Sequence, residues 1–176
     1  MSICTNNERI SDILYTDRLR IVPLSPDAFA KRLAAARRDN PERYAELEEL
    51  QERMEQGREA DFYWYTDREI YLADSDICIG SVALMSAPLT DPEHLIEVGY
   101  GIDAPYRCHG YMKEALARIC EMVERVAGET IDGMIAGVQS DNLPSQKVLA
   151  ACGFVMTDES ETLRLQIWKR ILQQGL

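Results

Sequence analysis

The segment spanning residues 93–127 constrains the fold more than any other part of the chain, because two different periodicities meet in it. In EHLIEVGYGI (93–102), apolar residues occupy every second position from Ile96 to Ile102, which predicts a half-buried strand. From Gly110 to Ala127 apolar residues recur at intervals of four and three, which predicts a helix with one core-facing side. Another strand pattern, TIDGMIAGVQS (130–140), follows at once. The unit is therefore strand–helix–strand, with the helix packed on a sheet.

The flanking segments add antiparallel strands and further helices. Residues 68–74 and 77–85 are strand-like and are separated by Ser75 and Asp76, which predicts a hairpin. The other predicted strands are 17–24, 154–158 and 162–170, and the other predicted helices are 25–38, 41–57 and 143–152. Together these segments predict an α+β fold in one domain, residues 1–176, with helices packed on a mixed sheet.

Composition and charge exclude several classes of function. A net charge of −11 argues against nucleic acid as a partner. No apolar run approaches the roughly 20 residues that cross a bilayer, and the N-terminus lacks an export pattern, so we expect no membrane and a cytoplasmic location. The five cysteines form no CxxC pair, which predicts reduced thiols. The two histidines, His94 and His109, are too isolated to predict a metal site.

The polar turn YRCHGYM (106–112) joins the predicted strand to the predicted helix. The first turn of a helix exposes unpaired backbone N–H groups and carries partial positive charge, so such a turn can hold an anion. Arg107 and His109 would add positive charge there. Ordinary loop chemistry explains the spacing equally well. The familiar nucleotide motifs GxxxxGK[ST] and GxGxxG with its helix are absent from the sequence.

Two blocks, EVGYGIDAPYRCHGYMKEAL and VQSDNLPSQKVLAACGF, resemble the GNAT superfamily of N-acetyltransferases, and most of all its ribosomal-protein N-terminal (Rim-type) branch. The resemblance implies the GNAT acyl-CoA N-acyltransferase fold, a mixed and mostly antiparallel sheet of about six or seven strands flanked by about four helices, with central strands splayed at a bulge near Gly99. It also implies acetyl-CoA as co-substrate. The cofactor-binding residues would be Val98, Gly99, Tyr100, Arg107, Cys108, His109, Gly110, Tyr111, Met112, Asn142 and Ser145.

The sequence departs from the family pattern at three places. Cys108 replaces the usual glycine, which is costly if the position requires a positive φ. His109 replaces a common Lys or Arg, which leaves less fixed charge on the turn. The tyrosine that many GNAT enzymes use as general acid is absent, since Ala150 and Ala151 stand where it would be.

Glu97 and Ser145 are the candidate catalytic residues. Backbone N–H groups of 98–100 would polarise the thioester carbonyl. Glu97 would accept a proton from the amine, directly or through water, unless it is only a solvated strand carboxylate. Ser145 would donate to the leaving sulfur, or only cap its helix. Tyr100 could donate instead, although its apolar parity favours a core role.

The predicted function is transfer of acetyl from acetyl-CoA to a primary amine, either a protein N-terminal α-amine or a small-molecule amine. The alternative is a GNAT-like module that binds acyl-CoA without turnover. Neither the acceptor nor the choice between monomer and homodimer follows from the sequence. The aromatic cluster DFYWYTD (61–67) could line an acceptor pocket, but a core plug or a dimer contact is the preferred interpretation.

Overall fold

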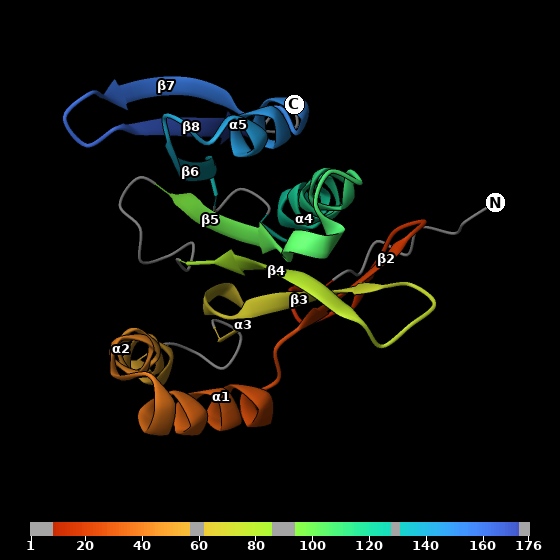
Figure 1. Cartoon of the computed structure of the whole chain (residues 1–176), viewed down its shortest axis with the longest axis vertical. Coiled ribbons are helices and arrows are strands. Elements are labelled where there is room, and N and C mark those ends of the chain that lie inside the picture. Colours follow the sequence, from red (N-terminus) through yellow and green to blue (C-terminus); the bar gives the residue numbers. More distant parts are fainter. Residues whose placement is uncertain (1–8, 57–61, 86–93, 128–130, 173–176) are drawn as a thin grey trace.

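The computed structural model describes residues 9–56, 62–85, 94–127 and 131–172 (Figure 1). Its strands are β1 (Leu14–Tyr15), β2 (Leu19–Pro23), β3 (Asp67–Leu72), β4 (Cys78–Leu84), β5 (Leu95–Ile102), β6 (Gly133–Gln139), β7 (Val155–Ser160) and β8 (Leu165–Ile171). Its α-helices are α1 (Pro26–Asp39), α2 (Pro41–Gln56), α3 (Phe62–Tyr65), α4 (Tyr111–Ala127) and α5 (Leu143–Ala151), and a short 3-10 helix, η2 (Ala104–Tyr106), precedes α4.

The strands follow the order β1-β2-β3-β4-β5-β6-β8-β7, and every neighbouring pair is antiparallel except β5 and β6. The α+β prediction is confirmed, and so is the β3–β4 hairpin. The described residues hold eight strands rather than six or seven, because the two-residue β1 pairs with β2 through Leu14 and Ile21. They also hold five α-helices rather than four, the unexpected one being the four-residue α3.

The central strands part as expected. β5 and β6 pair only from Leu95–Gly133 to Glu97–Ile135, although β5 continues to Ile102. We call the opening beyond Glu97 and Ile135 the fork. The bulge expected near Gly99 does not interrupt the β4–β5 ladder, whose register runs unbroken through Gly99. Beyond the fork β5 stays paired with β4, and β6 stays paired with β8, so the sheet parts between two intact ladders.

Helix α4 covers one face of the sheet, beside β5 in Figure 1. Its apolar stripe is fully buried, with Leu116, Ile119 and Val123 all at 0% exposure. Burying each such side chain stabilises the fold by about 1.5–3 kcal/mol. This packing fixes the N-terminus of α4 beside the fork.

The aromatic residues 62–65 form α3, and some of their side chains pack in the core. Trp64 is buried in the main core, and Phe62 packs edge-to-face on Phe29 of α1 with ring centroids 6.1 Å apart. Asp61 lies outside the described residues, as does the expected helix end at Gly57. Helices α1 and α2 enclose a second, smaller apolar cluster at the opposite end of the molecule from α5 (Figure 1).

Candidate active site

A cleft opens beside the fork, between the free end of β5 and the N-termini of α4 and α5. Its volume is about 580 Å³, within the range of small-molecule sites. The structure brings most of the predicted residues into its lining, namely Tyr100, Arg107, Cys108, Gly110, Tyr111, Met112, Asn142 and Ser145. Glu97, Val98, Gly99 and His109 are not among its lining residues.

The turn Arg107–Gly110 is called the phosphate turn below, after the anion that the sequence leads us to expect there. It has the left-handed backbone that the sequence left in question. Cys108 has a φ of 64° and Gly110 a φ of 81°. Arg107 Nε donates to the carbonyl of Ile102 at 2.8 Å, which ties the turn to the end of β5. The position of Cys108 requires a positive φ, which brings the Cβ of this residue too close to the backbone. A glycine here would avoid that strain because it has no Cβ.

The cleft is positively charged, although the protein is not. Arg107, Lys113 and Lys147 line it, and none of the described lining residues is acidic. The two lysines are residues that our reading of the sequence missed. The sequence could have identified Lys113, because the helix dipole disfavours a cation in the first turn of a helix. A lysine there suggests that an anion binds nearby. His109, by contrast, stacks on Tyr111 with ring centroids 5.6 Å apart.

Arg18 and Glu114 form an ion pair, called the clamp below, that is hydrogen-bonded to the phosphate turn. Arg18 Nε donates to Glu114 at 2.7 Å, and Arg18 Nη1 donates to the carbonyl of His109 at 3.1 Å. Burial acts to raise the pKa of the Glu114 carboxyl, but hydrogen bonds from Thr16 and Arg18 outweigh it, so that the pKa is lowered. No local sequence signal identifies the clamp, since its two members lie 96 residues apart.

Two hydroxyl groups meet at the mouth of α5. Asn142 caps this helix by accepting from Ser145 N at 3.2 Å. Ser145 Oγ lies 2.8 Å from the Tyr100 hydroxyl, which is also 3.2 Å from the Ser145 carbonyl. Tyr100 therefore packs its ring against the core, as its parity predicted, and places its hydroxyl in the cleft. Burial raises the pKa of Tyr100, and the hydrogen bond with Ser145 opposes the rise.

Glu97 lies at the fork, and its side chain is on the face of the sheet opposite to the cleft. Side chains alternate along a strand, so exposed Glu97 points away from the face that carries Tyr100. The backbone also alternates. The carbonyl of Glu97 accepts a hydrogen bond from Met85 N, and Asp103 N donates to the carbonyl of Ile79. The backbone groups of the odd-numbered residues of β5, Gly99 among them, therefore face β4. The backbone groups of Val98 and Tyr100 face the fork, and Gly99 is thus excluded as an oxyanion donor there.

Two further observations bear on the class of protein. Over the described parts of the chain, no three His, Cys, Asp or Glu side chains gather as a metal site would need. In the same residues, no helix combines the length and the apolar character that crossing a bilayer demands.

Comparison with known proteins agrees with this geometry. The family model described as "Acetyltransferase (GNAT) domain" matches residues 18–155. The uncharacterized N-acetyltransferase YjdG of Bacillus subtilis (strain 168) is 29% identical over 82 residues, which is 47% of this chain and 46% of YjdG. The match therefore spans about half the length of that relative.

Solved structures show the same fold. Ribosomal-protein-S5-alanine acetyltransferase from Vibrio fischeri superposes with a TM-score of 0.65 at 18% identity, over 92% of this chain and 97% of that one. RimL, a ribosomal L7/L12 alpha-N-protein acetyltransferase in complex with coenzyme A, gives 0.64 at 16% identity, over 93% and 99%. Since the family model spans most of the sequence, and the fork and its cleft lie within the matched segment, the chain belongs to the GNAT acetyltransferase family.

Proposed function

We propose that the protein is an N-acetyltransferase that moves the acetyl group of acetyl-CoA directly to a primary amine. The observation that carries the proposal is a cleft whose described lining residues include three cations and no acid, and which joins the phosphate turn to the fork in a chain of net charge −11. A pocket with this charge, opposite to that of the whole protein, suits a polyanionic ligand. Membership of the GNAT family supports acetyl-CoA as that ligand.

Acetyl-CoA would lie with its pyrophosphate at the N-terminus of α4. Backbone N–H groups of 108–112 would donate to it, and the side chains of Arg107, Lys113 and Lys147 would balance its charge. The pantetheine arm would then follow β5 beyond Glu97, where the ladder with β6 has ended. The backbone N–H of Tyr100, which faces the fork, would polarise the thioester carbonyl.

The amine would approach from the face that carries Glu97. In the reaction the amine nitrogen forms a bond to the acetyl carbon, the carbon–sulfur bond breaks, and the amine loses a proton to Glu97 or to water. The thiolate gains a proton from Ser145, which is replaced by the proton of Tyr100 across the 2.8 Å contact. Tyr100 recovers its proton from solvent. The hydroxyl pair thereby replaces the tyrosine missing at Ala150 and Ala151.

The exposure of Glu97 favours an acceptor that needs only a weak base. At pH 7 an α-amine with a pKa of about 7.8 is neutralised at a cost of about 1.1 kcal/mol, whereas a lysine side chain costs about 4.6 kcal/mol. We therefore rank protein N-terminal α-amines and small weakly basic amines above lysine side chains. RimL, which shares the fold, is named as an alpha-N-protein acetyltransferase, which is a name for an acceptor of the first kind. We expect a cytoplasmic enzyme, active as a monomer or a homodimer.

The second candidate is a module that binds acyl-CoA without turnover. The missing tyrosine and the substitution at Cys108 favour it, and a module that only binds acyl-CoA needs no general acid. Release of free thiol from acetyl-CoA in the presence of amines separates the two functions. A binding module would be stabilised by acetyl-CoA but would release no thiol above the rate without protein.

The deciding experiment is thermal unfolding with and without excess acetyl-CoA, followed by the thiol assay on Glu97→Gln and Ser145→Ala. Ligand at about 100 times its dissociation constant adds about 2.7 kcal/mol, which should raise the midpoint by roughly 5–11 °C. Both variants should keep this shift and lose turnover. Absence of a shift at millimolar acetyl-CoA would remove the proposal, and full activity of a variant would remove the role of that residue.

A further inference from the structure

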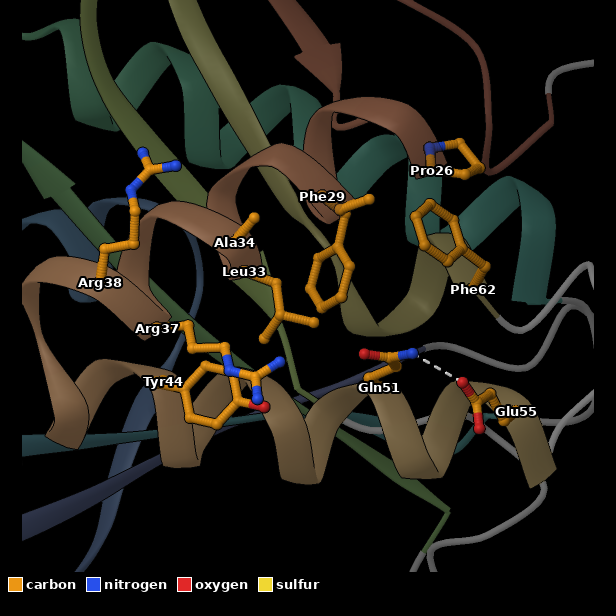
Figure 2. A pocket seen from close by; sticks show the side chains of 11 residues that line it. Pro26, Phe29, Leu33, Ala34, Arg37, Arg38, Tyr44, Gln51, Glu55 and Phe62 are labelled. Carbon is orange, nitrogen blue, oxygen red and sulfur yellow. Dashed lines mark hydrogen bonds between the residues drawn. The ribbon is translucent and has the colours of Figure 1, made fainter.

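A second cavity lies between α1 and α2, away from the cleft at the fork (Figure 2). Its volume is about 770 Å³, which is also within the range of ligand sites. It is a groove, because one wall is α1 and the other is α2, with Phe62 of α3 closing one end. From Tyr44 to Glu55 the α2 wall is about 16 Å long at the rise of an α-helix.

The floor of the groove is apolar. Phe29 and Leu33 of α1 point toward α2, and Phe62 lies beside Phe29 (Figure 2). Phe29 belongs to a small cluster, separate from the main core, that has four buried side chains among the described residues. Leu33 and Phe62 are only partly buried, although they lie between packed helices. A ligand with an apolar body would remove this surface from water.

Charge is distributed unevenly along the groove. At one end Arg37 extends over the ring of Tyr44, with its guanidinium carbon 5.8 Å from the ring centroid (Figure 2). Neither Arg37 nor its neighbour Arg38 forms an ion pair with a described carboxylate side chain, in a chain of net charge −11. Glu48, which accepts a hydrogen bond from the Tyr44 hydroxyl at 2.6 Å, offsets one of these two arginine charges. Glu55 lines the other end, where it accepts a hydrogen bond from Gln51 at 2.7 Å, and no described lining residue there is a cation.

We propose that this groove binds an amphipathic carboxylate, with its apolar chain along Phe29, Leu33 and Phe62 and its head group at Arg37. The planar guanidinium can hold a carboxylate through two parallel hydrogen bonds, which its present contact with Tyr44 does not prevent. Glu55 determines the orientation of the ligand in the groove, because it would repel a carboxylate head group at its own end. The site is separate from the cleft at the fork and does not depend on the proposed catalytic function.

The test compares two probes of equal chain length below their micelle concentrations, dodecanoate and dodecyltrimethylammonium, by isothermal titration calorimetry. Dodecanoate should bind with one site per chain and at least tenfold more tightly than the ammonium. Arg37→Gln should weaken dodecanoate binding by about tenfold or more, because a charge-assisted hydrogen-bond pair is lost. Lys31→Gln removes the same charge from an exposed position of α1 outside the groove and should change nothing.

Ala34→Glu provides a second variant, since Ala34 is exposed on the groove wall and glutamate is a good helix former. It should abolish dodecanoate binding, and Ala34→Gln should weaken it much less. Equal affinity for the two probes, or equal affinities of the Arg37→Gln and Lys31→Gln variants, would overturn the proposal. So would a dimer in light scattering that Ala34→Glu separates, because the groove would then be an interface between copies.

Discussion

At the scale of single residues, Cys108 shows how the site conflicts with local preference. A non-glycine residue in the left-handed region costs roughly 1–2 kcal/mol, and Cys108 has a φ of 64°. We therefore expect Cys108→Gly to raise the free energy of unfolding by about 1 kcal/mol and to preserve the acetyl-CoA shift, as measured by urea denaturation. Cys108→Ala keeps the Cβ and loses the thiol. A gain for alanine equal to that for glycine would show that φ is not the cause.

Tyr100 is the other residue whose role can be isolated. Removing its hydroxyl in Tyr100→Phe should lower kcat by about 10²-fold, because general acid catalysis contributes roughly 10² to 10⁴. Affinity for acetyl-CoA should stay the same, since the ring remains in place. The double variant with Ser145→Ala should be little slower than either single variant if the two hydroxyls act in one relay. Multiplicative losses would mean that they act separately.

At the scale of elements, the clamp of Arg18 and Glu114 joins the edge strands to the first turn of α4. Its hydrogen bonds are charge-assisted, so Glu114→Gln should lower stability by about 1 kcal/mol and loosen the phosphate turn. A weaker acetyl-CoA affinity with unchanged kcat is expected by equilibrium binding and steady-state kinetics. Glu121→Gln, on the exposed side of the same helix, is the matched control.

The clamp also predicts a pH dependence. The pKa of Glu114 is lowered in the folded protein, so its contribution is fully present above the unfolded value of about 4.3. The contribution is lost as pH falls through the lower folded pKa. Urea denaturation between pH 7 and pH 3 should therefore show a difference between wild type and Glu114→Gln that is constant above about pH 5 and shrinks below pH 4. A constant difference down to pH 3 would contradict the assignment.

At the scale of the whole molecule, the charge of the protein and the charge of its cleft have opposite signs. The net charge of −11 should repel the polyanionic co-substrate at long range, while Arg107, Lys113 and Lys147 should hold it at short range. We expect the association rate constant to rise with salt up to about 0.15 M, and the dissociation rate constant to rise as well, in stopped-flow measurements. Lys113→Gln should speed dissociation. An association rate that falls with salt would show that the local charge dominates the encounter.

Much of the fold and part of the site followed from the sequence. Short-range patterns carried that information, because the apolar periods of 93–102 and 110–127 depend on neighbouring residues alone. The positive φ at Cys108 was only a question raised by the sequence, and the structure answered it. The resemblance to GNAT enzymes, and with it the splayed strands, rested on two such local blocks.

Tertiary structure decided which distant groups meet. Arg18 reaches Glu114 across 96 residues, and the hydroxyl of Tyr100 reaches Ser145 across 45. It also decided that the cleft lies on the face of β5 that carries Tyr100 and not on the face that carries Glu97, because strand alternation fixes only that the two side chains lie on opposite faces. Local periodicity specifies an element and its buried side. Contacts between elements depend on how the elements pack, and for that reason the clamp, the hydroxyl pair and the groove on α1 and α2 required the structure.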